Sequence, residues 1–262
     1  MENLNITPKQ LQILLLLYRF RFLDRTQIQR FLNHKNHRRI IDWLNDLTSK
    51  NIIGRKYSNR LKENTKPAIY YLATKSRKIL LSQPETNEKL LNRVYREKIR
   101  SVKLIEHCIF ATDFYFYLKK QTQAKKIKLH FYTKTDLSNY YYLPYQRPDA
   151  YIATKEDKTM KRYFLEIIDE GTPRFMLRSK IRQYIEYFEE NTWQENTGHP
   201  NPKLLFVCPN ETIKTFLYKH ITQVLGEETE EEIDFYLTTR ETVKDSELQG
   251  NIWKKVEEED LA

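Results

Sequence analysis

The sequence has little cysteine, little glycine and no long apolar run. Its two cysteines, Cys108 and Cys208, sit in apolar contexts, which excludes a disulfide-stapled secreted fold and a zinc-finger or zinc-ribbon site. The five glycines form neither a G-x-x-x-x-G-K-[ST] nor a G-x-G-x-x-G pattern, which argues against P-loop ATPases and dinucleotide-binding enzymes. The longest apolar stretch, residues 11–18, is far shorter than the roughly 20 residues of a membrane-spanning helix. No secretory signal is visible, so we expect a soluble cytoplasmic protein without membrane contact.

Charge is distributed unevenly along the 262 residues. The formal net charge is +10, and the first hundred residues carry 22 lysines and arginines against 8 acidic residues. A basic first third is typical of proteins that bind a polyanion, most simply nucleic acid. Residues 227–262 carry 4 basic against 13 acidic residues. This acidic end is either a solvated surface or a tail that competes with DNA or recruits a basic partner.

The first seventy residues follow the order of a winged helix-turn-helix. Thr7 followed by Pro8 is a strong helix start, because threonine accepts a hydrogen bond from an orphan amide and proline fits the first helical position. Apolar residues at helical spacing predict one helix to about residue 21 and two more that follow it. Two β-prone runs, 52–57 and 68–72, flank a basic segment and predict a hairpin. In a winged helix the third helix enters the major groove of DNA.

Basic side chains gather where a winged helix meets DNA. Residues 35–66 hold nine lysines and arginines against three acidic residues. We expect phosphate contacts to dominate the affinity and the start of the third helix to read base edges. The alternative is a protein contact or a solvated basic face. The predicted DNA-binding residues are Lys35, Asn36, His37, Arg38 and Arg39 in the third helix, and Arg55, Lys56, Arg60, Lys62 and Lys66 in the hairpin.

The second half alternates helices and strands. The pattern predicts a long apolar helix over 104–118, followed by three strands, a helix from about 172, a strand, a further helix and a last strand. This order predicts an α/β sandwich and matches the core of restriction-endonuclease-like domains. The expected division is a winged helix-turn-helix over 1–82, a linker over 83–97, an endonuclease-like α/β domain over 98–240 and an acidic C-terminal tail over 241–262.

Two carboxylates in this half have the spacing of a metal-dependent phosphodiesterase. Such enzymes hold Mg²⁺ with acidic residues on neighbouring strands and use a lysine to polarise the attacking water or the phosphate. Asp149 precedes the second strand, and Glu166 follows 17 residues later in the third. Ile168 stands where the lysine is expected, so a lysine on the next helix is the candidate that reaches back. The predicted catalytic residues are Asp149, Glu166 and Lys180, and the predicted metal ligands are Glu106, Asp149 and Glu166.

Four tyrosines precede Asp149, at positions 140, 141, 142 and 145. Aromatic rings in a loop can stack on unpaired bases, or they can pack in a core or an interface. A relaxase nucleophile is not favoured, because relaxases need a histidine cluster for their metal and this sequence has none. The sequence leaves the first two roles open.

The order of several segments resembles the replication-relaxation family, whose members are carried by plasmids, phages and integrative elements. The segments are TPKQLQILLLLYRFRFLD, LIEHCIFATDFYFYL, RPDAYI, FLEIIDEGT, LRSKIRQYIEYF and LLFVCP, from about residue 7 to residue 224. The resemblance implies a winged helix joined to an endonuclease-like domain, and a role in replication or relaxation of mobile-element DNA. The matching positions are His107, Asp113, Arg147, Pro148, Asp149, Glu166, Asp169, Gly171 and Thr172.

These patterns together predict a DNA-binding accessory protein that acts in replication or relaxation of a mobile element. It is expected to bind double-stranded DNA beside replication or relaxation proteins, with an inactive nuclease-like domain and no cofactor. One alternative is a Mg²⁺-dependent nuclease or nickase, which would need that ion. Another is a winged-helix transcriptional regulator whose second half senses or dimerises. A homodimer is compatible with a winged helix, although the sequence shows no heptad seam.

Overall fold

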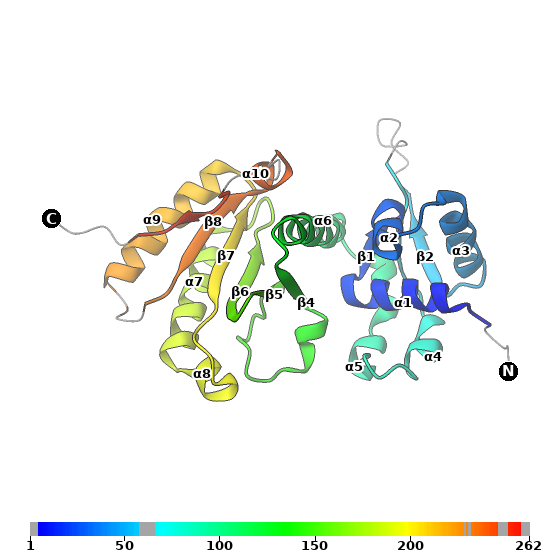
Figure 1. The fold of residues 1–262 in the computed structure, drawn as a ribbon, viewed down its shortest axis with the longest axis horizontal. Coiled ribbons are helices and arrows are strands. Elements are labelled where there is room, and N and C mark those ends of the chain that lie inside the picture. The colour runs from blue at the N-terminus through cyan, green and yellow to red at the C-terminus, as the bar shows by residue number, and fades with distance from the viewer. Residues whose placement is uncertain (1–4, 58–65, 228, 230–231, 246–250, 258–262) are drawn as a thin grey trace. The chain divides into compact units, whose positions relative to one another are not determined.

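The computed structural model describes residues 5–57, 66–227, 229, 232–245 and 251–257 (Figure 1). The chain divides into two compact units, residues 1–113 and 114–262. The division falls inside the long helix α6 (Val102–Ala124) and not in the segment 83–97 that the sequence predicts as a linker. That segment contains the short helix α5 (Glu88–Leu91) and most of the 3-10 helix η2 (Val94–Ile99), so it is folded structure of the first unit.

Three helices open the first unit, as the sequence predicts. They are α1 (Pro8–Phe20), α2 (Arg25–Leu32) and α3 (His37–Ser49). Each begins at a residue whose side chain accepts hydrogen bonds from the first backbone amides: Thr7, Asp24 and Asn36. These caps satisfy donors that a helix cannot satisfy by itself, and they fix the starting residue of each helix. A fourth short helix, α4 (Ser76–Leu80), follows the hairpin.

The first unit also contains a three-stranded antiparallel sheet in the order β1-β3-β2. The strands are β1 (Phe22–Asp24), β2 (Ile53–Lys56) and β3 (Ile69–Leu72). The hairpin of β2 and β3 is the predicted one, whereas β1 falls where the sequence indicates only a break between helices. A three-residue strand is too short to show alternation, and β1 forms because Phe22 and Leu23 are buried while they pair with β3. These helices and strands follow the order that the sequence predicts for a winged helix.

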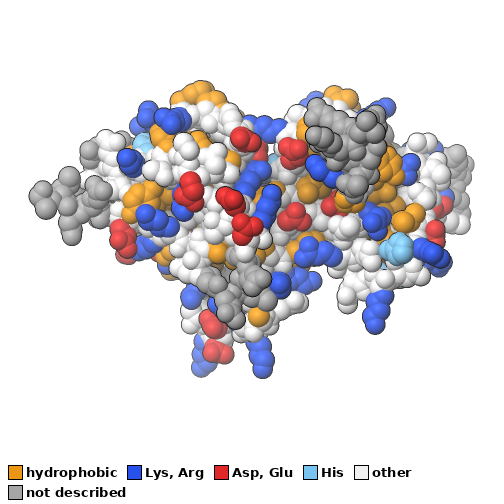
Figure 2. All heavy atoms as spheres, turned by 90° about the horizontal axis from the view of Figure 1, so that it is seen from above, with side chains coloured by type: hydrophobic (Ala, Val, Ile, Leu, Met, Phe, Trp, Pro, Cys, Tyr) orange, Lys and Arg blue, Asp and Glu red, His pale blue; other side chains and the backbone are white. Residues whose placement is uncertain are grey.

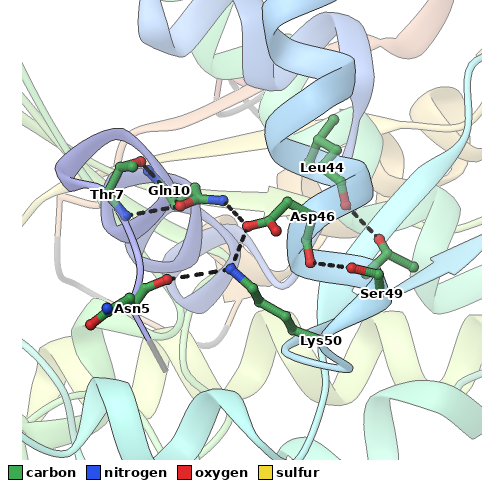
Figure 3. A network of polar contacts seen from close by, with 8 residues as sticks. Asn5, Thr7, Gln10, Leu44, Asp46, Ser49 and Lys50 are labelled. Carbon is green, nitrogen blue, oxygen red and sulfur yellow. Dashed lines mark hydrogen bonds and ion pairs between the residues drawn. The ribbon is translucent and has the colours of Figure 1, made fainter. Parts of the chain in front are cut away.

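A polar network joins the start of α1 to the end of α3 (Figure 3). The Gln10 side chain donates to Asp46 Oδ2 over 2.6 Å, and the Lys50 ammonium lies 2.8 Å from the same oxygen. Lys50 also donates to the backbone carbonyl of Asn5 at 3.3 Å. The hydrogen bond that Lys50 donates to Asp46 lowers the pKa of the Asp46 carboxyl, and this effect exceeds the opposing effect of burial. The network therefore holds α3 in a defined position against α1.

The second unit is built on a six-stranded sheet in the order β4-β5-β6-β7-β8-β9. Strands β4, β5 and β6 are antiparallel, β6, β7 and β8 are parallel, and β9 returns antiparallel to β8. Their bounds are β4 (Lys128–Thr133), β5 (Ala150–Glu156), β6 (Thr159–Ile167), β7 (Lys203–Cys208), β8 (Phe235–Thr239) and β9 (Lys254–Lys255). The order α6, β4, β5, β6, helix, β7 is that of a restriction-endonuclease-like core, so the predicted fold class is confirmed.

Helices of the second unit cover this sheet and form its core. They are α7 (Arg174–Glu189), α8 (Thr192–Thr197), α9 (Glu211–Glu227) and α10 (Arg240–Asp245), with the 3-10 helix η3 (Asp136–Asn139) after β4. Residues of α7 and α9 pack with those of β6, β7 and β8 in one hydrophobic cluster that includes Phe164, Tyr184 and Phe206. Helix α7 lies in sequence between the parallel strands β6 and β7. It is therefore the crossover that returns the chain to the end of the sheet at which both strands begin. No helix among the described residues is both long and apolar enough to cross a membrane.

The described part of the predicted acidic tail is built into this unit. Strand β9 pairs with β8, Val256 is 3% exposed, and α10 follows β8 directly. Lys255 and Lys203 both contact Asp234, at 2.7 and 2.6 Å. The prediction of a separate tail is therefore wrong for these residues. The prediction rested on the net charge of the whole segment. The pairing of β9 with β8 instead depends on a few basic and apolar residues, such as Lys255 and Val256.

Candidate functional site

The N-terminal end of α3 carries an exposed basic surface, while the opposite face of the helix is buried in the core. Residues 35–39 are all exposed, whereas Ile40, Leu44 and Leu47 on the opposite face are fully buried. The Asn36 side chain accepts hydrogen bonds from the backbone amides of Arg38 and Arg39, at 3.0 and 3.4 Å. Asn36 therefore sets where α3 begins, and the following side chains project outward from its first turn.

The hairpin residues next to α3 divide into two groups. Arg55 is exposed on β2 and donates to Asn45 Oδ1 of α3 at 3.3 Å, so this part of the hairpin lies beside α3. Lys66 is also exposed. Lys56 instead donates to the backbone carbonyl of Arg100 at 3.4 Å and is only partly exposed. The other two hairpin residues predicted to bind DNA, Arg60 and Lys62, lie outside the described residues.

Surface charge by itself does not single out an interface. On the face drawn in Figure 2, lysine and arginine side chains are spread over the surface, with acidic and apolar side chains between them. The basic residues of α3 and β2 are distinguished by their position at the start of one helix and on the neighbouring strand. In the part of the chain that the structure describes, no ion pair with an acidic residue holds Arg38 or Arg39.

In the second unit, Asp149 is fixed at the head of β5 by the neighbouring strand. Its backbone amide donates to the Leu165 carbonyl at 2.9 Å, and its Oδ2 accepts from the Ile167 amide at 2.9 Å. These partners flank Glu166 on β6, so the pairing of β5 with β6 brings the two acidic residues together. Lys134, from the end of β4, lies 3.5 Å from Asp149 Oδ1. The Asp149 carboxylate is therefore held by the sheet and faces a lysine.

Glu166 is buried, and α7 supplies both of its described side-chain partners. The Lys180 ammonium lies 2.9 Å from Glu166 Oε1, and the Tyr184 hydroxyl donates to the same oxygen. Lys180 and Tyr184 are four residues apart on α7, so one face of the helix presents both groups. The structure thus brings together Asp149, Glu166 and Lys180, the three predicted catalytic residues. Sequence reasoning missed Tyr184, although its spacing from Lys180 was a usable signal.

The electrostatics of this carboxylate cluster follow from burial. Burial raises the pKa of Glu166; the Lys180 ammonium opposes this effect and the nearby Asp149 adds to it. Burial and the adjacent Glu166 also hold the pKa of Tyr184 well above its ordinary value, so its hydroxyl stays protonated and donates. Two carboxylates face two lysine ammonium groups, which balances the formal charge within the cluster.

The three predicted metal ligands are divided between the two units: Glu106 belongs to the first, and Asp149 and Glu166 belong to the second. Glu106 is exposed on the part of α6 that belongs to the first unit. Across the described ranges, no group of three or more His, Cys, Asp or Glu side chains is arranged to hold a metal ion. Asp149 and Glu166 offer two carboxylates from neighbouring strands, which Mg²⁺ accepts when waters complete its shell. This donor pair fits the ion in its chemistry.

A family model described as replication-relaxation matches residues 14–201, which is more than half of the chain. The protein belongs to the replication-relaxation family. The match begins within α1 and includes both acidic residues and Lys180. Among solved structures, restriction endonuclease FokI is similar with a TM-score of 0.34 and 13% identity, over 90% of this chain and 42% of that chain. FokI bound to DNA gives a TM-score of 0.30 and 12% identity, over 93% and 45%.

This replication-relaxation protein spans less than half the length of the FokI chains that it matches. No curated protein matches the chain. Several positions that carry the family resemblance have structural partners. The Gln27 side chain, which is almost fully buried, donates to Asp113 at 2.8 Å, and Asp169 lies 2.7 Å from Arg240. Gly171 has a φ of +70°, which favours glycine, in the turn between β6 and α7.

Proposed function

We propose that this replication-relaxation protein is an accessory factor that binds duplex DNA through α3 and the hairpin of β2 and β3. The proposal rests on one observation: the first turn of α3 is basic and exposed, and the opposite face of this helix is fully buried. A helix anchored in this way can enter the major groove without losing its own packing. The family supports a role in replication or relaxation of mobile-element DNA.

Each part of the interface has a distinct role in this proposal. Because Asn36 caps α3, the side chains that face the bases are His37, Arg38 and Arg39. Arg55 and Lys66 contact phosphates of the neighbouring backbone. Lys56 contributes little, because its ammonium is bonded within the first unit. Most of the affinity is electrostatic and depends on salt.

The test measures duplex binding by fluorescence anisotropy at two salt concentrations. Arg38→Ala combined with Arg39→Ala is expected to weaken binding, because it removes base contacts and also two positive charges that help to neutralise the adjacent phosphates. The slope of log K against log salt should fall by up to about 2, since each neutralised phosphate contributes about 0.9. The matched control, Lys98→Ala with Lys103→Ala, removes the same charge from exposed positions of the first unit outside α3 and the hairpin. Equal affinity of the α3 variant and the wild type at both salt concentrations rejects the docking model.

One observation favours a second candidate, a Mg²⁺-dependent DNA nuclease. The Lys180 ammonium lies 2.9 Å from Glu166. Lys180 on α7 could thus take the role of the lysine that such nucleases have at the position of Ile168. In this candidate Asp149 and Glu166 would hold the ion, which would supply a Lewis acid for phosphodiester hydrolysis. Lys180 would orient the attacking water or the phosphate.

Incubation with supercoiled plasmid, with and without Mg²⁺ or Mn²⁺, tests this candidate. Metal-dependent nicking that Asp149→Asn abolishes, while duplex binding persists, would establish a nuclease. A mobility shift without nicking at any metal concentration leaves the accessory DNA-binding factor. The Lys128→Ala variant is the control and should leave any nicking unchanged, because it removes an exposed charge at the opposite end of β4 from Lys134 and Asp149.

A further inference from the structure

An open groove of about 610 Å³ runs along α7 in the second unit. One wall consists of α7 residues at spacings of three and four, which places them on one face of the helix: Phe175, Arg178 and Arg182. The other wall is the loop that ends at residue 147, with Tyr145 and Gln146. The groove combines aromatic rings with arginines, and neither the duplex-binding surface nor the carboxylate cluster uses these rings.

The loop wall is held firmly against α7. The backbone amide of Gln146 donates to Gln183 Oε1 at 3.2 Å, and Gln183 Nε2 donates to the backbone carbonyl of Gln146 at 3.3 Å. Lys180 donates to the same carbonyl at 3.1 Å. The Arg147 guanidinium donates to the backbone carbonyls of Leu137 and Tyr140, both at 3.2 Å. Tyr145 therefore stands next to two fixed residues.

Two aromatic rings of the groove lie in solvent. Tyr145 is 93% exposed and Phe175 is 70% exposed. Among the described residues, neither ring stacks on another ring or contacts a cation. Large exposed rings at fixed positions are typical of binding surfaces, since they gain apolar contact without losing much side-chain freedom.

We propose that this groove binds an unpaired DNA strand, with bases stacked on Tyr145 and Phe175 and phosphates contacted by Arg178 and Arg182. Paired bases do not offer their faces for stacking, so the site selects single-stranded over duplex DNA. Two arginines against one acidic residue, Glu186, favour a polyanion over an acidic or apolar peptide. The inference rests on the proposed DNA-binding function and names a second DNA form for it.

One hydrogen bond connects the groove to the carboxylate cluster. Gln146 lines the groove, and its carbonyl accepts from Lys180, whose ammonium holds Glu166. A strand in the groove would therefore pass next to this cluster. Relaxation and replication both require melted DNA, so a site for an unpaired strand supplements the duplex contact of α3.

The experiment measures anisotropy of a labelled 20-nucleotide oligothymidine and of a labelled duplex, each with the full-length protein. Tyr145→Ala combined with Phe175→Ala is expected to weaken oligothymidine binding by at least about fivefold, since a stacked base is worth roughly 1–3 kcal/mol. Duplex affinity should be unchanged. Tyr145→Phe keeps a ring and should retain wild-type affinity. The controls are Tyr95→Ala, an exposed ring outside the groove, and Lys244→Ala, an exposed charge on α10.

The two proposals fail in different ways. Wild-type protein that does not bind oligothymidine, or groove variants that bind it as tightly as the wild type, overturn the groove proposal and leave the groove to a protein partner. A loss of single-strand and duplex binding together also overturns it, because the groove is then not selective. If Arg38→Ala with Arg39→Ala leaves duplex binding intact while the groove variants lose oligothymidine, the α3 model fails and the groove stands.

Discussion

The Lys180 ammonium lies 2.9 Å from Glu166 Oε1, and the two side chains are only 11% and 5% exposed. This ion pair joins the crossover helix α7 to β6, inside the core of the second unit. A buried pair contributes little net stability over apolar residues, but removing one partner leaves a desolvated charge. The pair is therefore a sensitive point of the fold, whatever chemistry it performs.

Lys180→Met should lower the free energy of unfolding by about 3–5 kcal/mol, because it leaves Glu166 buried and unpaired. Glu166→Gln in the same background should recover a large part of this loss. Urea denaturation of the four proteins of this cycle gives the coupling energy. Lys134→Met, whose lysine is 58% exposed, should cost less than about 1 kcal/mol. Additive single losses would show that Lys180 and Glu166 are not coupled.

The pH dependence of the Lys180→Met variant should differ from that of the wild type. Burial already raises the pKa of Glu166, and removal of the ammonium raises it further. A carboxyl group with a raised pKa binds more protons in the folded state, so stability falls as pH increases from the unfolded pKa to the folded pKa. The stability deficit of the variant should therefore be smaller at about pH 4.5 than at pH 7. A deficit that is equal at both pH values contradicts this assignment.

Asp46→Asn tests the network between α1 and α3. Its pKa is lowered by the hydrogen bond from Lys50, so its contribution to stability is present above the unfolded pKa and is lost as pH falls through the folded pKa. The Asp46 side chain is 41% exposed, which limits the expected loss at pH 7 to about 0.5–1 kcal/mol. Asp42→Asn, on an exposed position of α3, is the matched control. Thermal unfolding should show a smaller difference between the variant and the wild type at pH 3 than at pH 7.

Gly54→Ala should destabilise the first unit by about 1–3 kcal/mol. A Cβ at this position would overlap the ring of Tyr71, which is buried and packs against Phe22. The loss should shrink in a Tyr71→Leu background, which chemical denaturation can measure. Gly226→Ala is the contrasting control, because a Cβ on that helical glycine meets no atom within 4 Å. An unchanged midpoint for Gly54→Ala would show that the ring moves aside without cost.

The sequence predicted the helices and strands that have a long hydrophobic periodicity, and it predicted the site residues whose charged groups follow the spacing of a known type of metal site. Asp149 and Glu166 were found from spacing alone, and Lys180 because a lysine was missing at Ile168. Tyr184 was missed, since a tyrosine ring at helical spacing packs like any aromatic and nothing in the spacing shows that its hydroxyl donates to Glu166. Strand β1 and the pairing of β9 were missed because short segments depend on partners that lie far away in the chain.

Helix α6 belongs to both compact units, since the division between residues 113 and 114 falls within its 23 residues. Expression of either unit on its own therefore cannot stop at that division without cutting this helix in half. A workable fragment of the first unit ends at about residue 124, and one of the second unit begins at about residue 101. The two fragments then both contain α6, so together they hold this helix twice and do not add up to the intact chain.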